Sequence, residues 1–286
     1  MNPFTFHGIT VDRSSDLGAA PRRQGQPRNE VRIGLIVPSS NVTLERELPR
    51  LLAQREGSGL GGVSFHSSRV RMRSVTPEEL AGMNAQAARA AQGLADASVN
   101  VVVYGCLVAV MAEGAGAHRE AEARLEAVLA AEGQPVPVVS SARALVDTLR
   151  LMGATRVAVV APYLPALTQR VCAYLENEGV GIAAARSLSV SDNRVVGQLD
   201  PQLLVRIARQ LPRDVDAVVL SACVQMPSLP VLQETEDRLG VPVISAATAT
   251  AFQVLRTLGV TTRVAGAGRL FSPAFDSAGS LAWKEL

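Results

Sequence analysis

The sequence has few of the residues that mark a protein of nucleic acids, membranes or the secretory pathway. Lysine occurs once, at Lys284, so nearly all of the 28 basic side chains are arginines, and 26 acidic residues leave a formal net charge of +2. That charge is too small to predict a nucleic-acid-binding surface. No apolar run reaches the roughly 18 residues of a membrane span, and the first 29 residues lack the apolar core of a secretory signal. We therefore expect a cytoplasmic protein without nucleic-acid or membrane partners.

Cysteine and histidine are also scarce. The chain has three of each, and none of them are grouped with the spacing of a zinc site. An odd number of widely separated cysteines does not predict a disulfide framework. We expect free, reduced thiols and no metal.

What the chain does have is length and apolar content. Its 286 residues are 48% hydrophobic and 19% charged, which is typical of a globular protein with a sizeable core. Residues 1–29 differ from the rest, because they are polar and rich in glycine, proline and arginine. They are predicted to form a disordered N-terminal extension.

From residue 30 onward, strand-like and helix-like segments alternate. Runs of valine, isoleucine and leucine predict strands at Arg32–Val37, Val63–Ser67, Val99–Tyr104, Val136–Ser140, Arg156–Val160, Gly181–Leu188, Ala217–Ser221 and Val241–Ser245. The segments between them predict helices at Thr43–Gln54, Pro77–Ala97, Ala115–Glu132, Ala142–Met152, Pro165–Glu178, Pro201–Gln210, Leu229–Leu239 and Ala246–Leu258. This alternation indicates an α/β fold with mainly parallel sheets flanked by helices.

The chain also repeats itself. "RIGLIVPSS" (32–40) is echoed by "RVAVVAPYL" (156–164), and "NVVVYGCLV" (100–108) by "DAVVLSACV" (216–224). A third pair begins "VPVVSSA" at 136 and "VPVISAA" at 241. The repeat predicts two similar, pseudo-symmetric halves, residues 30–140 and 141–245. The segment at about 246–270 is expected to pack back on the first half, and residues 271–286 to form a C-terminal tail.

Two of the three cysteines occupy equivalent places in the repeat. Cys106 and Cys223 each follow a strand and precede an apolar stretch that could begin a helix. Since ligands of such sheets bind beyond the carboxyl ends of the strands, the thiols are expected on opposite walls of one cleft between the halves. A position ahead of a helix N-terminus favours the thiolate. Cys172 lies mid-helix without a counterpart and is interpreted as a packing residue.

Polar residues at the other strand ends have two readings. The serines and asparagine of "PSSN" (38–41) are suited to cap a helix or to bind a carboxylate. The basic segment "SSRVRMR" (67–73) is suited to bind an anionic substrate or a partner subunit, or to form a solvated loop.

These motifs together resemble a known family. "RIGLIVPSSNVTLERELP", "YGCLVAVM", "VAPYLPALTQ" and "LSACVQMPSLP" are similar to maleate cis–trans isomerases, of the aspartate/glutamate racemase superfamily and related to arylmalonate decarboxylase. The resemblance covers about residues 31–270. It implies cofactor-independent conversion of maleate, a small dicarboxylate, to fumarate, with the chain acting as a homodimer.

The resemblance also implies roles for individual residues. Cys106 would be the nucleophile that forms a succinyl-cysteine intermediate, and Cys223 the general acid and base. The remaining candidates would bind the substrate: Asn41, Tyr163, Asn193, Ser39, Ser40, Val224 and Leu107. The chemistry is consistent, because adding a thiolate to an alkene makes its blocked C=C bond single for a time.

Two alternatives stay open. An amino-acid or hydantoin-type racemase would use the same two thiols, one to remove a proton and one to return it. It would need a group that binds an amino substituent, and Asp192 is the one acidic residue adjoining the predicted site. The other alternative is a non-catalytic dicarboxylate-binding protein. A decarboxylase is disfavoured, because arylmalonate decarboxylases typically keep one of the two thiols.

Overall fold

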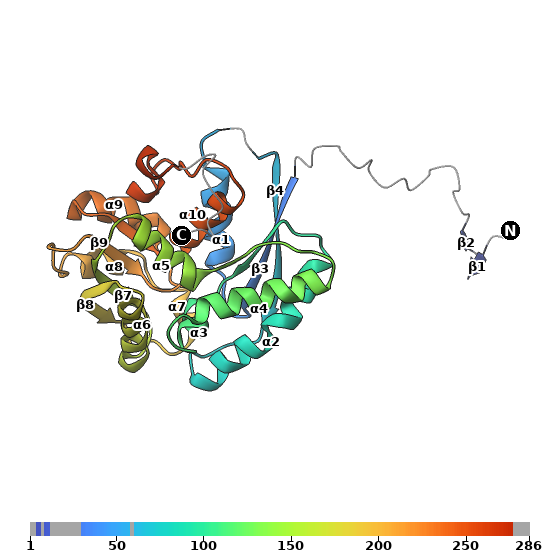
Figure 1. Cartoon of the computed structure of the whole chain (residues 1–286), viewed down its shortest axis with the longest axis horizontal. Coiled ribbons are helices and arrows are strands. Elements are labelled where there is room, and N and C mark those ends of the chain that lie inside the picture. The colour runs from blue at the N-terminus through green and yellow to red at the C-terminus, as the bar shows by residue number, and fades with distance from the viewer. Residues whose placement is uncertain (1–3, 7–8, 12–29, 58–59, 277–286) are drawn as a thin grey trace.

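Two four-stranded parallel sheets carry the fold (Figure 1). The computed structural model describes residues 4–6, 9–11, 30–57 and 60–276. The first sheet has the strand order β4 (Gly62–Val70), β3 (Glu30–Pro38), β5 (Val101–Tyr104) and β6 (Val138–Ser140). The second has the order β8 (Gly181–Ser187), β7 (Arg156–Ala161), β9 (Ala217–Ser221) and β10 (Val243–Ser245).

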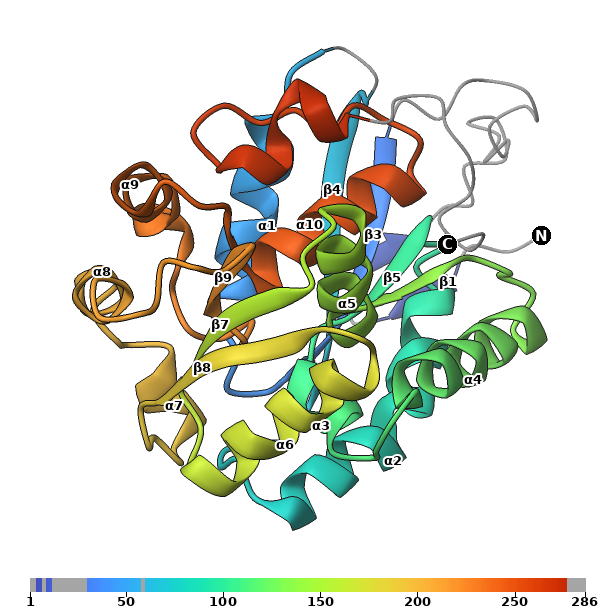
Figure 2. The same cartoon turned by 60° about the vertical axis from the view of Figure 1, so that its left-hand side comes forward.

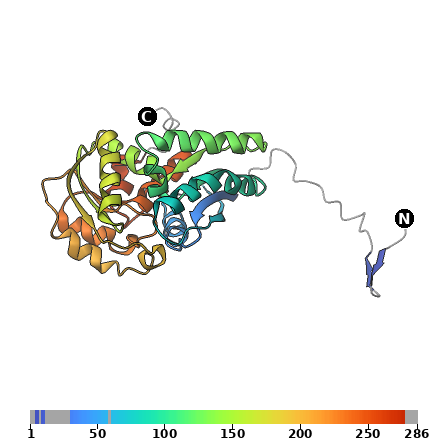
Figure 3. The same ribbon diagram turned by 90° about the horizontal axis from the view of Figure 1, so that it is seen from below.

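The strand order is the same in both sheets. In each, the first strand along the chain lies between the second and the third, and the fourth pairs with the third. The predicted α/β fold with two similar halves is confirmed, and Figure 3 shows the blue-to-green elements of one half beside the yellow-to-orange elements of the other. Every residue of β5 and of β9 is buried. The continuous apolar runs of these strands arise because both faces of each sheet are covered.

The longer helices lie where the sequence predicts them, with each end within two residues of the predicted one. They are α1 (Leu44–Ala53), α2 (Pro77–Ala95), α4 (Ala117–Ala131), α5 (Ser141–Leu151), α6 (Pro165–Asn177), α8 (Gln202–Ala208), α9 (Leu229–Leu239) and α10 (Ala246–Thr257). No helix in the described part of the chain is both long and apolar enough to cross a membrane.

Short elements are where the prediction was incomplete. Helices α3 (Leu107–Met111) and α7 (Asn193–Val196) were not predicted, because one turn is too short to show a helical periodicity. Strands β6 and β10 begin two residues later than predicted, directly after Pro137 and Pro242. Proline has no N–H to donate to a neighbouring strand, so it stands at the start of each.

The N-terminal extension was predicted without secondary structure. The structure has an antiparallel pair there, β1 (Phe4–Phe6) with β2 (Ile9–Val11), which the prediction did not include. The remainder of residues 1–29 lies outside the described residues, as do residues 277–286 of the predicted tail. Residues 269–275 of the described part form two short 3-10 helices, η1 (Arg269–Phe271) and η2 (Pro273–Phe275).

Helix α10 connects the two halves. It follows the last strand of the second sheet and contacts α5, α1, β5 and β6, so that it lies between α1 and α5 in Figure 2. Its residues from Ala246 to Leu255 are all buried, and Gln253 donates a hydrogen bond to Thr148 of α5 at 3.3 Å. The helix that follows the last strand of the second sheet therefore packs against strands of the first.

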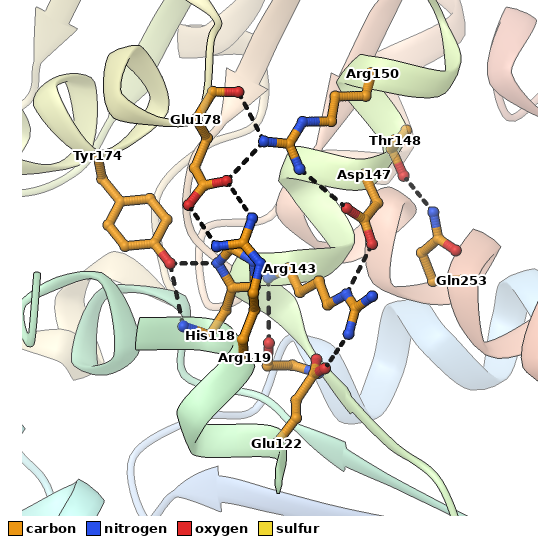
Figure 4. Close-up of polar contacts among 11 residues, drawn as sticks. His118, Arg119, Glu122, Arg143, Asp147, Thr148, Arg150, Tyr174, Glu178 and Gln253 are labelled. Carbon is orange, nitrogen blue, oxygen red and sulfur yellow. Dashed lines mark hydrogen bonds and ion pairs between the residues drawn. The ribbon is translucent and has the colours of Figure 1, made fainter. Parts of the chain in front are cut away.

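A cluster of charged side chains joins α4, α5 and α6 on the other side of α5 (Figure 4). Glu178, at the end of α6, accepts hydrogen bonds from Arg119 of α4 at 2.8 and 3.1 Å and from Arg150 of α5 at 2.7 Å. The hydroxyl of Tyr174 contacts the ring and the backbone N–H of buried His118. These contacts join α6 to α4 and α5.

Candidate active site

Cys106 lies at the carboxyl end of the first sheet. Strand β5 ends at Tyr104, Gly105 donates a backbone hydrogen bond to Ile36 at 2.8 Å, and Cys106 is the N-cap residue of α3. A Cβ atom on Gly105 would lie 2.5 Å from the Leu44 side chain. Glycine therefore lets the end of the strand pack closely against α1, and this packing sets the place of the buried thiol.

Cys223 has the equivalent position in the second half. Strand β9 ends at Ser221, whose hydroxyl donates to the carbonyl of Cys223 at 2.7 Å. The backbone N–H of Gln225 donates to the Cys223 sulfur at 3.4 Å, and the Tyr163 hydroxyl donates to the neighbouring carbonyl of Ala222 at 3.1 Å. The chain turns tightly after β9, where the first half has the short helix α3.

Both thiols line one small cavity between the halves. Its volume is about 10 Å³, close to that of a single water-sized sphere. Of the predicted site residues, seven line it: Cys106, Cys223, Asn41, Tyr163, Asn193, Leu107 and Val224. Any organic ligand has to displace part of the wall in order to enter.

Asn41 presents an unused hydrogen-bond donor to this cavity. Its Oδ1 atom accepts from the backbone N–H groups of Thr43 and Leu44, both at 3.1 Å, and so caps the start of α1. Its Nδ2 atom is buried and has no hydrogen-bond partner. A buried donor without a partner is costly, and a ligand oxygen would relieve that cost.

Burial has the opposite effect on the thiols from the one predicted. Desolvation raises the pKa of Cys106 to about 12, although the backbone N–H of Ala109 in α3 lowers it in part. Desolvation also raises the pKa of Cys223, against hydrogen bonds from Tyr163, Gln225 and Met226. The helix N–H group at the strand end acts on Cys106 in the predicted direction, but desolvation outweighs it. The sequence position does not reveal how completely the sulfur is removed from water.

Ser39 and Ser40 do not line the cavity. Their hydroxyls bond instead to the backbone of Met72. The Ser40 hydroxyl donates to the Met72 carbonyl at 2.6 Å, and the Met72 N–H donates to the Ser39 hydroxyl at 3.1 Å. Arg69 of the basic 67–73 segment donates to the carbonyls of Ser39 and Asn41 at 2.7 and 2.9 Å. In this structure the serines and Arg69 therefore brace the loop that carries Asn41.

Comparison with known proteins assigns the family. Residues 33–271 match the family described as arylmalonate decarboxylase. The chain belongs to that family. It is 49% identical to the maleate isomerase of Alcaligenes faecalis over 243 residues. This aligned region spans 84% of this chain and 96% of the Alcaligenes protein.

Two solved structures of maleate isomerases have the same fold as this arylmalonate decarboxylase family member. A cysteine-to-alanine variant from Pseudomonas putida S16, with maleate, is 47% identical, has a TM-score of 0.84 and covers 86% of this chain and 98% of its own. A cysteine-to-serine variant from Nocardia farcinica, with a covalently bound succinylcysteine intermediate, is 48% identical and has a TM-score of 0.82. The match covers 85% of this chain and 98% of the Nocardia chain. The resemblance inferred from the motifs is confirmed.

The sequence analysis of this family member missed several cavity residues. Pro38, Met72, Val75, Gly105, Val108 and Gln225 also line the cavity. The sequence held a signal for Gln225, because it is the polar residue of the otherwise apolar stretch that directly follows Cys223. No sequence signal points to Met72 and Val75. They lie in a loop of the first half that reaches the site through backbone hydrogen bonds to residues 191–193 of the second half.

Proposed function

We propose that this protein isomerises maleate to fumarate through a succinyl adduct on Cys106, with no cofactor. The observation that carries the proposal is a pair of buried thiols, one from each half, that line a single cavity. The same cavity is lined by Asn41, whose amide nitrogen has no hydrogen-bond partner. The structure of the Nocardia relative supports the covalent route, because a cysteine-to-serine variant of that isomerase carries a succinylcysteine intermediate.

The reaction begins when Cys106 has lost its proton to water, and the thiolate then adds to the alkene. The Cys106 thiolate forms a C–S bond to one alkene carbon, the π electrons move to the other carbon, and that carbon takes the proton of the Cys223 thiol. Rotation about the C–C bond, now single, brings the carboxylates trans. The Cys223 thiolate then removes a proton, the alkene re-forms, the C–S bond breaks, and Cys106 leaves as a thiolate. Atoms and charge balance over the cycle.

The surroundings of the two sulfurs differ in a way that supports these roles. The backbone N–H of Gln225 donates to the Cys223 sulfur at 3.4 Å. It would stabilise the thiolate that Cys223 becomes while the adduct exists. Tyr163 stays protonated throughout, because burial raises the pKa of its hydroxyl well above the usual value.

The lining of the cavity fits carboxylate recognition by neutral groups. None of its side chains carries a formal charge when the thiols are protonated. Asn41 has a free donor, and Tyr163 and Asn193 of the second half also line the cavity. Neutral donors that are already oriented can stabilise the negative charge that moves onto one carboxylate when sulfur adds.

The alternative of an amino-acid racemase gains no support at this site. Asp192, the acidic candidate for an amino substituent, does not line the cavity and pairs with Arg194 at 2.6 Å. A dicarboxylate-binding protein without catalysis would need no thiol pair.

The test is proton NMR of maleate with the reduced protein and three single variants. We expect fumarate with the parent and with Cys172→Ser, whose thiol lies outside the cavity, and a rate at least about 10³-fold lower with Cys106→Ser and Cys223→Ser. Intact mass should show one bound maleic acid on Cys223→Ser and none on Cys106→Ser.

Two outcomes would contradict the proposal. Fumarate formation by Cys106→Ser at the parent rate would exclude the covalent route. A folded, reduced parent that forms no fumarate would exclude the activity itself, and racemisation and ligand binding would then be measured. We further propose a homodimer in the cytoplasm, on the family resemblance, which light scattering after size-exclusion chromatography and cell fractionation would check.

A further inference from the structure

Gln225 makes more contacts between segments of the active site than its place in the sequence suggests. Its side-chain oxygen accepts from the backbone N–H groups of Val42 and Thr43 at 2.9 and 3.2 Å. Its side-chain nitrogen donates to the carbonyls of Ser40 and Asn193 at 2.8 and 3.0 Å. All four hydrogen bonds available to an amide are made, and the identity of the partners fixes which end is oxygen.

These partners flank the substrate-binding candidates. Val42 and Thr43 follow Asn41, on the loop that leads from β3 to α1 of the first half. Asn193 begins α7 of the second half. The backbone N–H of Gln225 itself donates to the Cys223 sulfur. One buried side chain therefore joins the loops of Asn41 and Asn193 to the turn of Cys223.

The end of α7 lies close against this amide. A Cβ atom on Gly197, at the end of α7, would lie 2.4 Å from the Gln225 nitrogen and 3.0 Å from its carbonyl carbon. The backbone of Gly197 has φ −69°, which any L-residue adopts. Glycine is required there because of the amide and not because of the chain conformation.

We propose that Gln225 is a positioning residue, which holds the two halves in register so that Asn41 and Cys223 meet the same substrate. An amide is needed for this. A glutamate would turn an oxygen toward the two carbonyls of Ser40 and Asn193, and an aliphatic side chain would leave all four backbone groups unpaired. The role in turnover rests on the proposed isomerase function.

The first test compares Gln225→Met with the parent and with Gln253→Met. Gln253 is also a buried glutamine, but it lies on α10 and does not line the cavity. We expect Gln225→Met to lower kcat at least about tenfold, and to retain the succinyl adduct in intact mass. Water can supply the proton that completes the adduct, but Cys223 is out of line to remove it again. Gln253→Met should keep the kcat of the parent and carry no adduct.

A second variant acts on the same amide without replacing it. Gly197→Ala should displace the Gln225 side chain and lower kcat in the same direction, although the glutamine itself is kept. This variant decides the question where Gln225→Met fails to fold. Parent-like kcat and KM in folded Gly197→Ala and Gln225→Met would overturn the proposal.

A third measurement needs no maleate. Iodoacetamide alkylation of Cys106 and Cys223, followed by peptide mapping relative to Cys172, reports how tightly the cavity is closed. We expect both variants to raise the alkylation rate of the two cavity thiols about tenfold, and unchanged rates would overturn the positioning role. If the parent forms no fumarate, the isomerase proposal fails, and this measurement still decides the role of Gln225.

Discussion

At the scale of single residues, Asn41 divides two tasks between the two atoms of one amide. The oxygen caps α1 through Thr43 and Leu44, and the nitrogen is buried without a partner at the cavity. Aspartate has the same shape and caps helices equally well. The two tasks can therefore be separated by a single substitution.

Asn41→Asp should keep the cap of α1 and impair turnover. Losing a hydrogen bond to a carboxylate costs about 1.5–3 kcal/mol, and like-charge repulsion adds to it, so kcat/KM should fall at least about 100-fold. The melting temperature should also fall, because the new carboxylate oxygen is buried without a partner. Steady-state kinetics check the first point, with Asn177→Asp at the exposed end of α6 as the control. An unchanged kcat/KM in folded Asn41→Asp would refute the role of the amide nitrogen.

At the scale of elements, a side chain of one half completes a helix of the other. Glu47 of α1 accepts from the N–H groups of Ser228 and Leu229 at 2.9 and 3.0 Å, at the start of α9. The Ser228 side chain makes no capping bond of its own. Burial raises the pKa of Glu47, and these backbone donors oppose that rise. The start of α9 thus depends on α1.

Glu47→Ala should lower the free energy of unfolding by about 2–4 kcal/mol, because two buried N–H groups lose their acceptor. Glu47→Gln keeps an acceptor and should recover much of this loss. Urea denaturation is the measurement. Glu234→Ala, which breaks the exposed ion pair with Arg238 on α9, is the control and should cost less than about 1 kcal/mol. Equal losses in the two alanine variants would contradict the capping role.

At the scale of the whole molecule, the halves are joined at the cavity, along α10 and at the charged cluster of Figure 4. In that cluster, desolvation lowers the pKa of His118 to about 4, although the charge of Glu178 opposes the shift. Three arginines lower it further: Arg119, Arg143 and Arg150. Desolvation raises the pKa of nearby Glu122 to about 7. The two groups therefore affect stability in opposite directions.

The sign for His118 follows from its depressed pKa. The folded state keeps the ring neutral, while an unfolded histidine takes up a proton near pH 6.5. The contribution of the neutral ring to the free energy of unfolding is complete above pH 6.5 and is lost as the pH falls toward 4. For Glu122, stability is instead lost as the pH rises from about 4.5 through 7. The two opposite pH dependences overlap in the parent, so the stability of the parent alone would not separate the contribution of either group.

His118→Phe isolates the histidine contribution. Between pH 6.5 and pH 5 the free energy of unfolding of this variant should rise relative to the parent by about 2 kcal/mol, after a constant offset for the lost Tyr174 contact. Urea denaturation at both pH values measures it. His66→Phe, on β4, is the control, and a pH-independent difference between His118→Phe and the parent would refute the assignment.

The division of the chain at residue 140 stays a prediction, as does the role of residues 246–270 as part of the first half. The contacts of α10 with α1, β5 and β6 support the second of these. Ser39 and Ser40 as substrate-binding residues also stay a prediction. Their hydroxyls bond to Met72, a contact between residues more than 30 positions apart that no local pattern indicates.

The sequence by itself determined the strands, the longer helices and the equivalent places of the two thiols, because these follow from local periodicity and from the internal repeat. Only the tertiary structure decided how small the cavity is, that burial raises the pKa of both thiols, and what Gln225 does. These depend on desolvation and on hydrogen bonds to distant residues, such as Val42, 183 positions away from Gln225. Such partners come together only when the two halves pack, and spacing along the chain carries no record of them.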